Sequence, residues 1–338
     1  MPPTPVLLPL PDGWPDGWPD TWSVRSPRPA DAPAVFELVS ACDEAVLGYP
    51  DVSLADVESD LGQDPHRQLL VLDGPAAVAW VWVDDKAAGR TPSDVYVDPQ
   101  LTARDPALAD DLARWCWDHA FVQAASIAAE RGLSETGVET GTLDGDTIGQ
   151  IRASAAGFTR VRTFWRMQRP LTADDREPVP AAGVAIRLLA PDETRSAYEI
   201  VEGAFADHWN YHPRTYDEWW DQYGNRSGFD PALWWVAEVD GQPAGVLIAN
   251  RQMADENAMY IAMLATRREA RGRGAAKALL RKAFAAGLAE GWGAAKLNVD
   301  SESSTSAPAL YASVGMSVEF ALHAWQQQVV AGYRSSAR

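Results

Sequence analysis

A short basic loop in the second half of the sequence has residues that could bind a phosphate group. The loop, Arg271-Gly-Arg-Gly-Ala-Ala276, follows an apolar run that predicts a strand, Ala258–Ala265, and opens an Ala- and Leu-rich segment that predicts a helix, Arg273–Leu288. N–H groups at the start of a helix point outward with the positive end of the helix dipole behind them, so we expect a diphosphate to bind there. The two glycines would let the backbone approach it closely, and the two arginines would add positive charge. An ordinary basic loop at a helix start is the alternative.

A second motif follows that predicted helix. Leu297–Val299 predicts a short strand, and Ala307–Val314 predicts a helix that a glycine ends. The basic loop resembles the acyl-CoA loop of the GCN5-related N-acetyltransferase (GNAT) family, Gln/Arg-x-x-Gly-x-Gly/Ala, with Glu269 at the first position. The block Leu297–Met316 resembles the end block of the family, Leu-x-Val-x3-Asn-x3-Ala-x2-Leu-Tyr-x3-Gly-Phe/Met, with Ser303 in place of the Asn. The two motifs stand in the family's order.

The resemblance implies that acetyl-CoA, or another acyl-CoA, binds to the C-terminal half. Tyr311 stands at the family's general-acid position, where a phenol with a pKa of about 10 could protonate the departing thiolate; the alternative is a packing aromatic. The strand should separate from its neighbour near Ala262–Leu264, which would leave an N–H group to bind the thioester oxygen. The predicted coenzyme contacts are Met263, Leu264, Glu269, Ala270, Arg271, Gly272, Arg273, Gly274, Ala275, Ala276 and Ser303.

The implied reaction is direct attack of a deprotonated amine on the thioester, which requires a base and an acceptor pocket. Glu256 is the first candidate for the base, since some relatives carry an acidic residue there, and a surface or helix-capping role is its alternative. His208 and His212 follow as candidates for the base. Acidic and aromatic residues suit a cationic amine, so the predicted substrate contacts are His208, Trp209 and Trp219, although tryptophans are also common core anchors. No metal is expected.

The elements that position these residues are most evident in the second half. Ala232–Val239 and Pro243–Asn250 predict two strands, and Asp240-Gly241 between them predicts a hairpin turn. The first half shows the same order of strands, followed by a long predicted helix over Pro106–Ala129. The fold class is therefore α/β (mixed α+β), and the resemblance implies two tandem GNAT domains, each a mixed, mostly antiparallel twisted sheet flanked by helices.

An internal repeat supports two domains. Val24–Val39 aligns with Ile186–Val201 at an offset of 162 (Arg25 to Arg187), with Asp31 matched to Asp192 after a slip of one residue. We expect a Pro/Trp-rich tail at 1–22, domains at 23–170 and 184–332, and a linker at 171–183.

The first half lacks the residues that would do the chemistry. No Arg-Gly-x-Gly loop follows its third predicted strand, and Ala153 stands where the second half has Tyr311. We expect this domain to be non-catalytic, although its helix near Pro106 could hold a second, structural CoA, as in some relatives. One active and one silent copy resemble mycothiol-synthase-like acetyltransferases, and the length and layout are similar to those of the tandem GNAT protein of the clavulanic acid cluster.

The charge balance excludes several classes of partner. The chain has 29 basic and 47 acidic residues, a net charge of −18, which would repel phosphate backbones and anionic lipid surfaces. Two cysteines cannot form a disulfide framework, and no signal peptide or membrane span is evident. We expect a cytoplasmic monomer or homodimer with no nucleic-acid or membrane partner.

The function that these features predict is N-acetylation of a small-molecule amine in secondary or thiol metabolism. Two alternatives stay open at this point: a non-catalytic protein that binds or senses acyl-CoA, and an O-acyltransferase.

Overall fold

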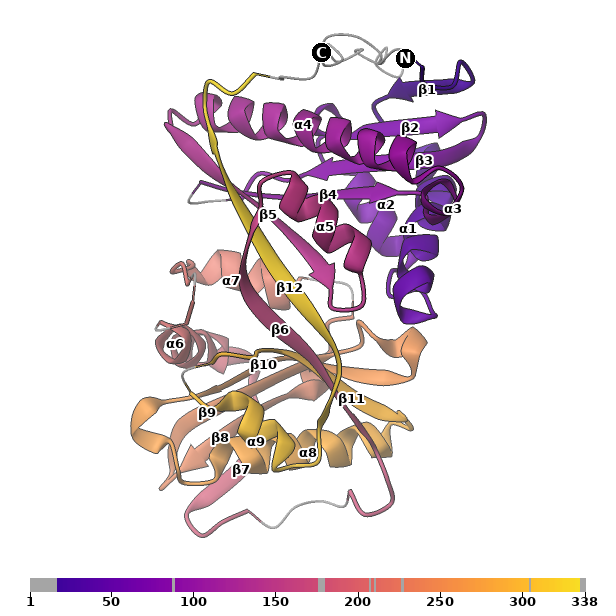
Figure 1. Ribbon diagram of the computed structural model, residues 1–338. Coiled ribbons are helices and arrows are strands. Elements are labelled where there is room, and N and C mark those ends of the chain that lie inside the picture. The colour runs from indigo at the N-terminus through magenta and orange to yellow at the C-terminus, as the bar shows by residue number, and fades with distance from the viewer. Residues whose placement is uncertain are drawn as a thin grey trace. The chain divides into compact units, whose positions relative to one another are not determined.

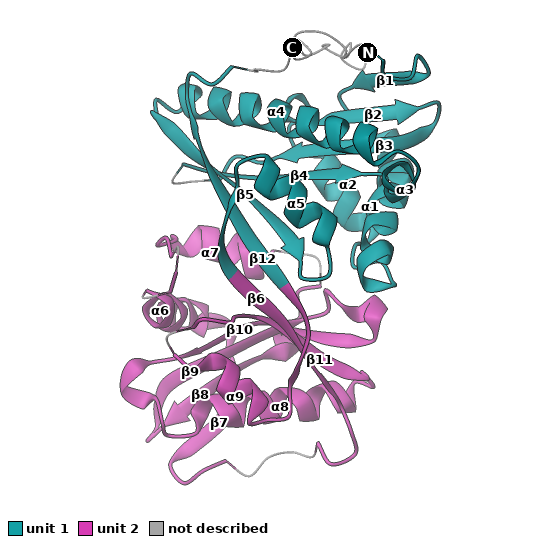
Figure 2. Cartoon of the chain, in the orientation of Figure 1, with its two compact units in different colours: residues 1–162, 322–338 teal, residues 163–321 magenta. Residues whose placement is uncertain are grey.

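In the computed structural model, which describes residues 17–86, 89–175, 180–206, 208–209, 211–225, 228–303 and 305–334, the chain forms two units (Figures 1 and 2). Unit 1 comprises residues 1–162 and 322–338, and unit 2 comprises residues 163–321. Strands β6 (Thr159–Pro170) and β12 (Ser317–Val330) contribute residues to both units. The division therefore passes through two strands, whereas the sequence analysis expects linear bounds at 170 and 184.

Unit 2 contains a mixed sheet with one parallel pair of strands. In spatial order its strands are β7 (Val184–Leu188), β8 (Trp234–Val239), β9 (Gln242–Asn250), β10 (Ala258–Thr266), β11 (Ala294–Asp300) and the unit 2 part of β6. β10 and β11 are parallel, and the other neighbours are antiparallel. Asp240 and Gly241 join β8 to β9 with φ angles of 52° and 78°, as in a tight hairpin turn. The predicted hairpin is confirmed.

Helices cover both faces of this sheet. They are α6 (Thr194–Phe205), α7 (Tyr216–Tyr223), α8 (Ala275–Ala289) and α9 (Ala307–Ala312). A Cβ built at Gly245 of β9 would lie 3.5 Å from Ala237 of β8 and 3.3 Å from Leu279 of α8, so these residues share one face. Trp234, three residues before Ala237, faces the opposite way and packs on Trp219 of α7, with ring centroids 5.8 Å apart. The sheet is therefore buried between α8 and α7.

Unit 1 repeats this plan. Its strands in spatial order are β1 (Trp22–Arg25), β2 (Leu69–Asp73), β3 (Ala76–Val83), β4 (Arg90–Val97), β5 (Glu135–Leu143) and the unit 1 part of β12. Only β4 and β5 are parallel among these pairs. Its helices are α1 (Ala32–Leu47), α2 (Leu54–Leu61), α3 (Pro99–Arg104), α4 (Pro106–Glu130) and α5 (Thr147–Ala155). The mixed, mostly antiparallel sheet expected in each half is present.

The internal repeat has a structural counterpart with no slip in register. Arg25 binds both carboxylate oxygens of Asp31 at 2.6 and 2.7 Å, and Arg187 binds both of Glu193 at 2.5 and 2.7 Å. Asp31 and Glu193 are 162 residues apart, as are the two arginines (193 − 31 = 187 − 25). The match of Asp31 to Asp192 is therefore wrong, because the carboxylate that closes the same turn in unit 2 is that of Glu193.

Two tryptophans near the N-terminus pack onto α4. The Trp18 ring lies 5.6 Å from the Trp22 ring and 5.5 Å from the Trp115 ring, both edge-on. Trp18 and Trp22 are buried. The earlier Pro/Trp units lie outside the described residues, so the anchoring of the tail is observed for Trp18 and Trp22.

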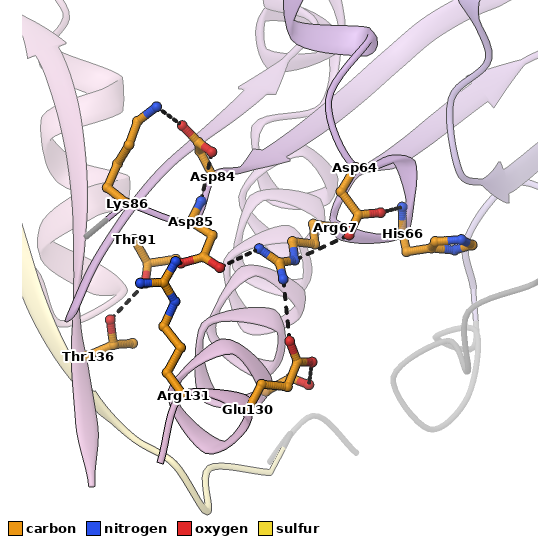
Figure 3. Close-up of polar contacts among 11 residues, drawn as sticks. Asp64, His66, Arg67, Asp84, Asp85, Lys86, Thr91, Glu130, Arg131 and Thr136 are labelled. Carbon is orange, nitrogen blue, oxygen red and sulfur yellow. Dashed lines mark hydrogen bonds and ion pairs between the residues drawn. The ribbon is translucent and has the colours of Figure 1, made fainter. Parts of the chain in front are cut away.

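A cluster of ion pairs ties the end of α4 to the connections between strands in unit 1 (Figure 3). Asp85 binds Arg67 at 3.0 Å and Arg131 at 2.7 Å, and Arg67 also lies 3.4 Å from Glu130. These charges neutralise one another in a network. We therefore interpret the cluster as structural.

Candidate active site

The parallel strands of unit 2 separate partway along their length. β10 pairs with β11 only over residues 258–260, although β10 continues to Thr266 and β11 to Asp300. On its other side, β10 shifts register against β9 between Ile261 and Met263, as at a β-bulge. Backbone N–H groups alternate sides along a strand, so beyond residue 260 those that face away from β9 have no ladder partner on β11. The opening lies where the sequence analysis expects it.

The N-terminus of α8 supplies free amides next to this opening. Gly272 and Gly274 have φ angles of 77° and 86°, which a residue with a Cβ rarely adopts. The first helical bond runs from the N–H of Ala278 to the carbonyl of Gly274 at 3.0 Å, and no side chain caps the helix. The N–H groups of residues 275–277 therefore have no acceptor within the helix. This geometry fits a diphosphate, since the amides and the helix dipole both favour an anion.

Positive charge is concentrated around these amides. Between residues 267 and 277 the chain has five basic residues and one acidic residue, a local net charge of 5 − 1 = +4 in a chain of net charge −18. Arg271 is exposed in this loop. Arg273 lies in the same loop and forms an exposed ion pair with Asp240 at 3.0 Å, so its predicted phosphate contact stays a prediction.

The other predicted coenzyme contacts lie on β10, in the basic loop, at the start of α8 and in the connection between β11 and α9. Met263 is buried on β10 and Leu264 is half-buried, whereas Glu269 is exposed in a single 3₁₀ turn. The side chains of Ala270 and Ala275 are buried in the core, so they offer a coenzyme their backbone only. Ser303 and Thr305 share a hydroxyl hydrogen bond of 2.8 Å in the connection between β11 and α9.

Tyr311 projects from α9 into the core of unit 2. Its side chain is 8% exposed, and burial, with a smaller contribution from the Tyr260 phenol, raises its pKa. Tyr260 is the last residue of β10 that pairs with β11, so the two phenols lie near the point of separation. A raised pKa keeps Tyr311 protonated at neutral pH, as a proton donor must be.

Glu256 forms part of a charge cluster around the buried Lys296, although Glu256 itself is exposed. Lys296 of β11 donates to Glu256 at 2.6 Å and to Glu319 at 2.8 Å, and its own side chain is 8% exposed. Burial disfavours the ammonium, but these two hydrogen bonds raise the pKa of Lys296. Glu256 therefore has an ion-pair partner in Lys296, and its role as the general base stays a prediction.

The charge cluster makes a testable contribution to stability. We expect Lys296→Met to lower the free energy of unfolding by about 3 kcal/mol, because two carboxylates then lose the ammonium that they share. Urea denaturation at neutral pH measures this. Glu256→Gln, which leaves the bond between Lys296 and Glu319, is expected to cost less than half as much; equal losses would contradict a shared ammonium.

Trp209 lies over the face of the sheet that carries Tyr260. Tyr260 pairs with Lys296, and Phe164 of β6 pairs with Asp300, four residues further along β11, so all of them face the same side. The ring of Trp209 lies 6.3 Å from that of Phe164. Trp209 is 39% exposed, so it covers the face beyond the separation and keeps surface for a ligand.

The other two predicted acceptor contacts, His208 and Trp219, have different environments in the structure. His208 precedes Trp209 and its ring lies 4.3 Å from that of Phe205. Trp219 is completely buried between Tyr198, Tyr216 and Trp234. The predicted substrate contact at Trp219 must be corrected, because this side chain has no exposed surface.

Sequence reasoning missed Tyr260, Lys296 and Glu319. A lysine within an apolar strand is a signal for a buried ion pair, and Lys296 gave that signal. Its partners lie 40 and 23 residues away in the sequence, so no local pattern identifies them.

The start of the corresponding helix in unit 1 differs from the start of α8. Its β4 and β5 also separate, pairing only over residues 90–92. The N-terminus of α4, however, is capped by the Asp105 carboxylate, which accepts from the N–H of Leu108 at 3.1 Å, and Pro106 supplies no N–H. A carboxylate thus occupies the position where an anion would bind.

Across the described residues, no helix is long and apolar enough to span a membrane, and no group of three or more His, Cys, Asp or Glu side chains could hold a metal ion.

Comparison with known proteins places this site in context. Residues 194–316 match the model of the acetyltransferase (GNAT) family. A mycothiol acetyltransferase of Thermobispora bispora is 32% identical over 51% of this chain and 59% of that protein. A mycothiol acetyltransferase of Streptomyces avermitilis is 27% identical over 87% of this chain and 90% of that protein. The alignments with the first three curated relatives cover 59%, 32% and 53% of their lengths, less than two thirds in each case.

Solved structures agree with the fold. A GCN5-related N-acetyltransferase from Sphaerobacter thermophilus has a TM-score of 0.75 and 29% identity, covering 95% of this chain and 99% of that one. A tandem GNAT protein from the clavulanic acid biosynthesis pathway has a TM-score of 0.66 and 15% identity over 93% of this chain and 100% of that one, a likeness of fold. The two predicted similarities, to mycothiol acetyltransferases and to this tandem fold, are confirmed.

Proposed function

We propose that this chain transfers an acetyl or other acyl group from coenzyme A to a small-molecule amine in unit 2, because residues 194–316 match the model of the acetyltransferase (GNAT) family. The observation that carries this proposal is the position of Tyr311. Its side chain is buried on α9 in the core of unit 2, and the free amides of α8 follow β10, the strand that separates from β11. This arrangement supports an anion site and a proton donor at one opening.

Each residue has a distinct task in this reaction. The amides of residues 275–277 and the charge of Arg271 bind the diphosphate, and the separated part of β10 presents an N–H, that of Met263 or Leu264, to the thioester oxygen. Acetyl-CoA supplies the activated acyl group. His208 accepts the proton of the amine, directly or through water, and Tyr311 donates a proton to the thiolate that leaves.

Two observations support the proposed class of acceptor: the exposed ring of Trp209 beside the opening, and the similarity to mycothiol acetyltransferases. Trp209 offers a ring face to a protonated amine before it reacts. Because the curated relatives are mycothiol acetyltransferases, we propose an amine of thiol metabolism first, and an amine of secondary metabolism second.

This function is tested by measuring the release of CoA from acetyl-CoA, with chromatography as the detection method. The acceptors are the amine precursor of mycothiol, cysteine, glucosamine, tyramine and spermidine, with N-acetylglucosamine as an alcohol that has no free amine. Turnover with an amine and none with the alcohol supports the proposal. Tight CoA binding without turnover would indicate a binding protein, and turnover with the alcohol an O-acyltransferase.

We propose that unit 1 binds no coenzyme and that catalysis belongs to unit 2. Asp105 already caps the helix that would hold the diphosphate, and its negative charge would repel that group. Isothermal titration with CoA is expected to give one site per chain. A stoichiometry of two would contradict this assignment and support the structural CoA that the sequence analysis considers.

A further inference from the structure

The connection between α6 and α7 is fixed to α6 by one carboxylate. Glu202 of α6 accepts from the Tyr211 hydroxyl at 2.6 Å. It also accepts from the Arg214 guanidinium at 2.7 and 3.1 Å, and from the Arg214 backbone N–H at 3.1 Å. The Glu202 side chain is 12% exposed. These four bonds give this side chain a larger role than a surface ion pair, which is worth little when exposed.

Further contacts hold the same two residues in place. The Arg214 carbonyl accepts from the Tyr198 hydroxyl at 2.6 Å, and its guanidinium donates to Gln222 at 2.5 Å. Burial and the hydrogen bond to Glu202 raise the pKa of Tyr211 to about 12, so its hydroxyl remains a donor at neutral pH. Arg214 thereby links α6 to α7, with Glu202 at the centre.

The connection that Glu202 binds also contains Trp209, which lies over the face of the sheet that carries Tyr260. Trp209 lies two residues before Tyr211 and against Phe164 of β6. Phe164 is paired with Asp300, beyond the separation of the parallel strands, so the position of Trp209 limits what can enter from this side. Whatever fixes Tyr211 and Arg214 therefore also fixes the wall that the acceptor meets.

We propose that Glu202 is a positioning residue that holds the described residues of the connection, 208–209 and 211–215, against α6 and thereby sets the affinity for the amine acceptor. It acts through Trp209 and touches neither the coenzyme nor the reacting atoms. This inference rests on the proposed function for its kinetic consequence, but the anchoring itself is independent of catalysis.

The test compares Glu202→Gln with a matched control, Glu193→Gln. Glu193 binds the Arg187 guanidinium through both oxygens, at 2.5 and 2.7 Å, and accepts the Ala190 backbone N–H at 3.1 Å, so these partners lie outside the connection. Glu202 instead accepts both guanidinium bonds through Oε1. Both variants remove one carboxylate charge that pairs with an arginine in unit 2, so they change the net charge equally. If Glu202→Gln does not fold, Tyr211→Phe replaces it in the test, because this variant removes only the hydroxyl that donates to Glu202.

Two readouts are needed. With the panel amine of highest turnover, we expect Glu202→Gln to raise the KM for the amine about tenfold, while kcat and the KM for acetyl-CoA change less than about twofold. Glu193→Gln should leave all three unchanged within about twofold. In the protein without ligands, amide hydrogen exchange at Arg214 should be about tenfold faster in Glu202→Gln and unchanged in Glu193→Gln.

The outcomes separate this inference from the proposed function. Equal KM values in the two variants, or a parallel loss for amine and acetyl-CoA, would overturn the positioning role of Glu202. Unchanged exchange at Arg214 would overturn the anchor itself. If no panel amine reacts, the proposed function fails, while the exchange experiment still decides whether Glu202 holds the connection.

Discussion

Replacing Tyr311 with phenylalanine is expected to lower turnover of acetyl-CoA by about 10²-fold or more, the contribution typical of a general acid. The ring would still fill its place in the core, since Tyr311 is buried on α9, so folding and coenzyme binding should change little. Only the proton donor to the thiolate is lost. Steady-state kinetics with the best panel amine and the Kd for CoA measure the two effects separately.

Tyr333→Phe is a matched control, because it removes a phenol hydroxyl in unit 1, where that hydroxyl donates to Asp118 at 2.6 Å. It should leave turnover unchanged. The raised pKa of Tyr311 adds a pH criterion: because its neutral form is the active one, its ionisation should not reduce the rate anywhere below about pH 10. A Tyr311→Phe variant as fast as the parent would remove this hydroxyl from the mechanism.

Reversing one charge beside the α8 amides is expected to weaken coenzyme binding. Arg271→Glu replaces an attractive side chain with a repulsive one near the diphosphate, and we expect the Kd for CoA to rise at least 30-fold, about 2 kcal/mol at the strength of a charge-assisted contact. Titration calorimetry at low salt measures it, and the difference should shrink as salt screens the charges.

Arg281→Glu is the control for net charge. Arg281 is exposed on α8, six residues after the first residue of that helix and about 9 Å along its axis, and the substitution changes the charge of the chain by the same amount. Its effect on the Kd should be less than threefold. Similar Kd values for the two variants would mean that the diphosphate does not bind beside Arg271.

The local parts of this site could be predicted from the sequence because local geometry dictates them. Gly272 and Gly274 adopt the left-handed φ angles that a tight loop before a helix requires, and both are visible as glycines. The helix of Tyr311 likewise follows from a short-range pattern, whereas the β10–β11 separation was expected from the resemblance to the GNAT family.

What the sequence did not reveal depends on partners far apart in the chain. Arg273, which lies within the basic loop, binds Asp240, which is 33 residues earlier in the chain. The pairing of β12 with β5 joins residues more than 170 positions apart, and no local pattern encodes it. The prediction for Trp219 failed for a different reason. Thr215 and Glu218 form a capping box, a local pattern that marks the start of α7 and would have assigned Trp219 to a helix.

The position of the diphosphate is the most direct measurement, and a crystal structure of the chain with acetyl-CoA provides it. We expect diphosphate oxygens about 3 Å from backbone nitrogens among residues 272–277, with the sulfur within hydrogen-bond reach of the Tyr311 hydroxyl. A diphosphate bound elsewhere in unit 2, or a sulfur far from Tyr311, would contradict the mechanism proposed here.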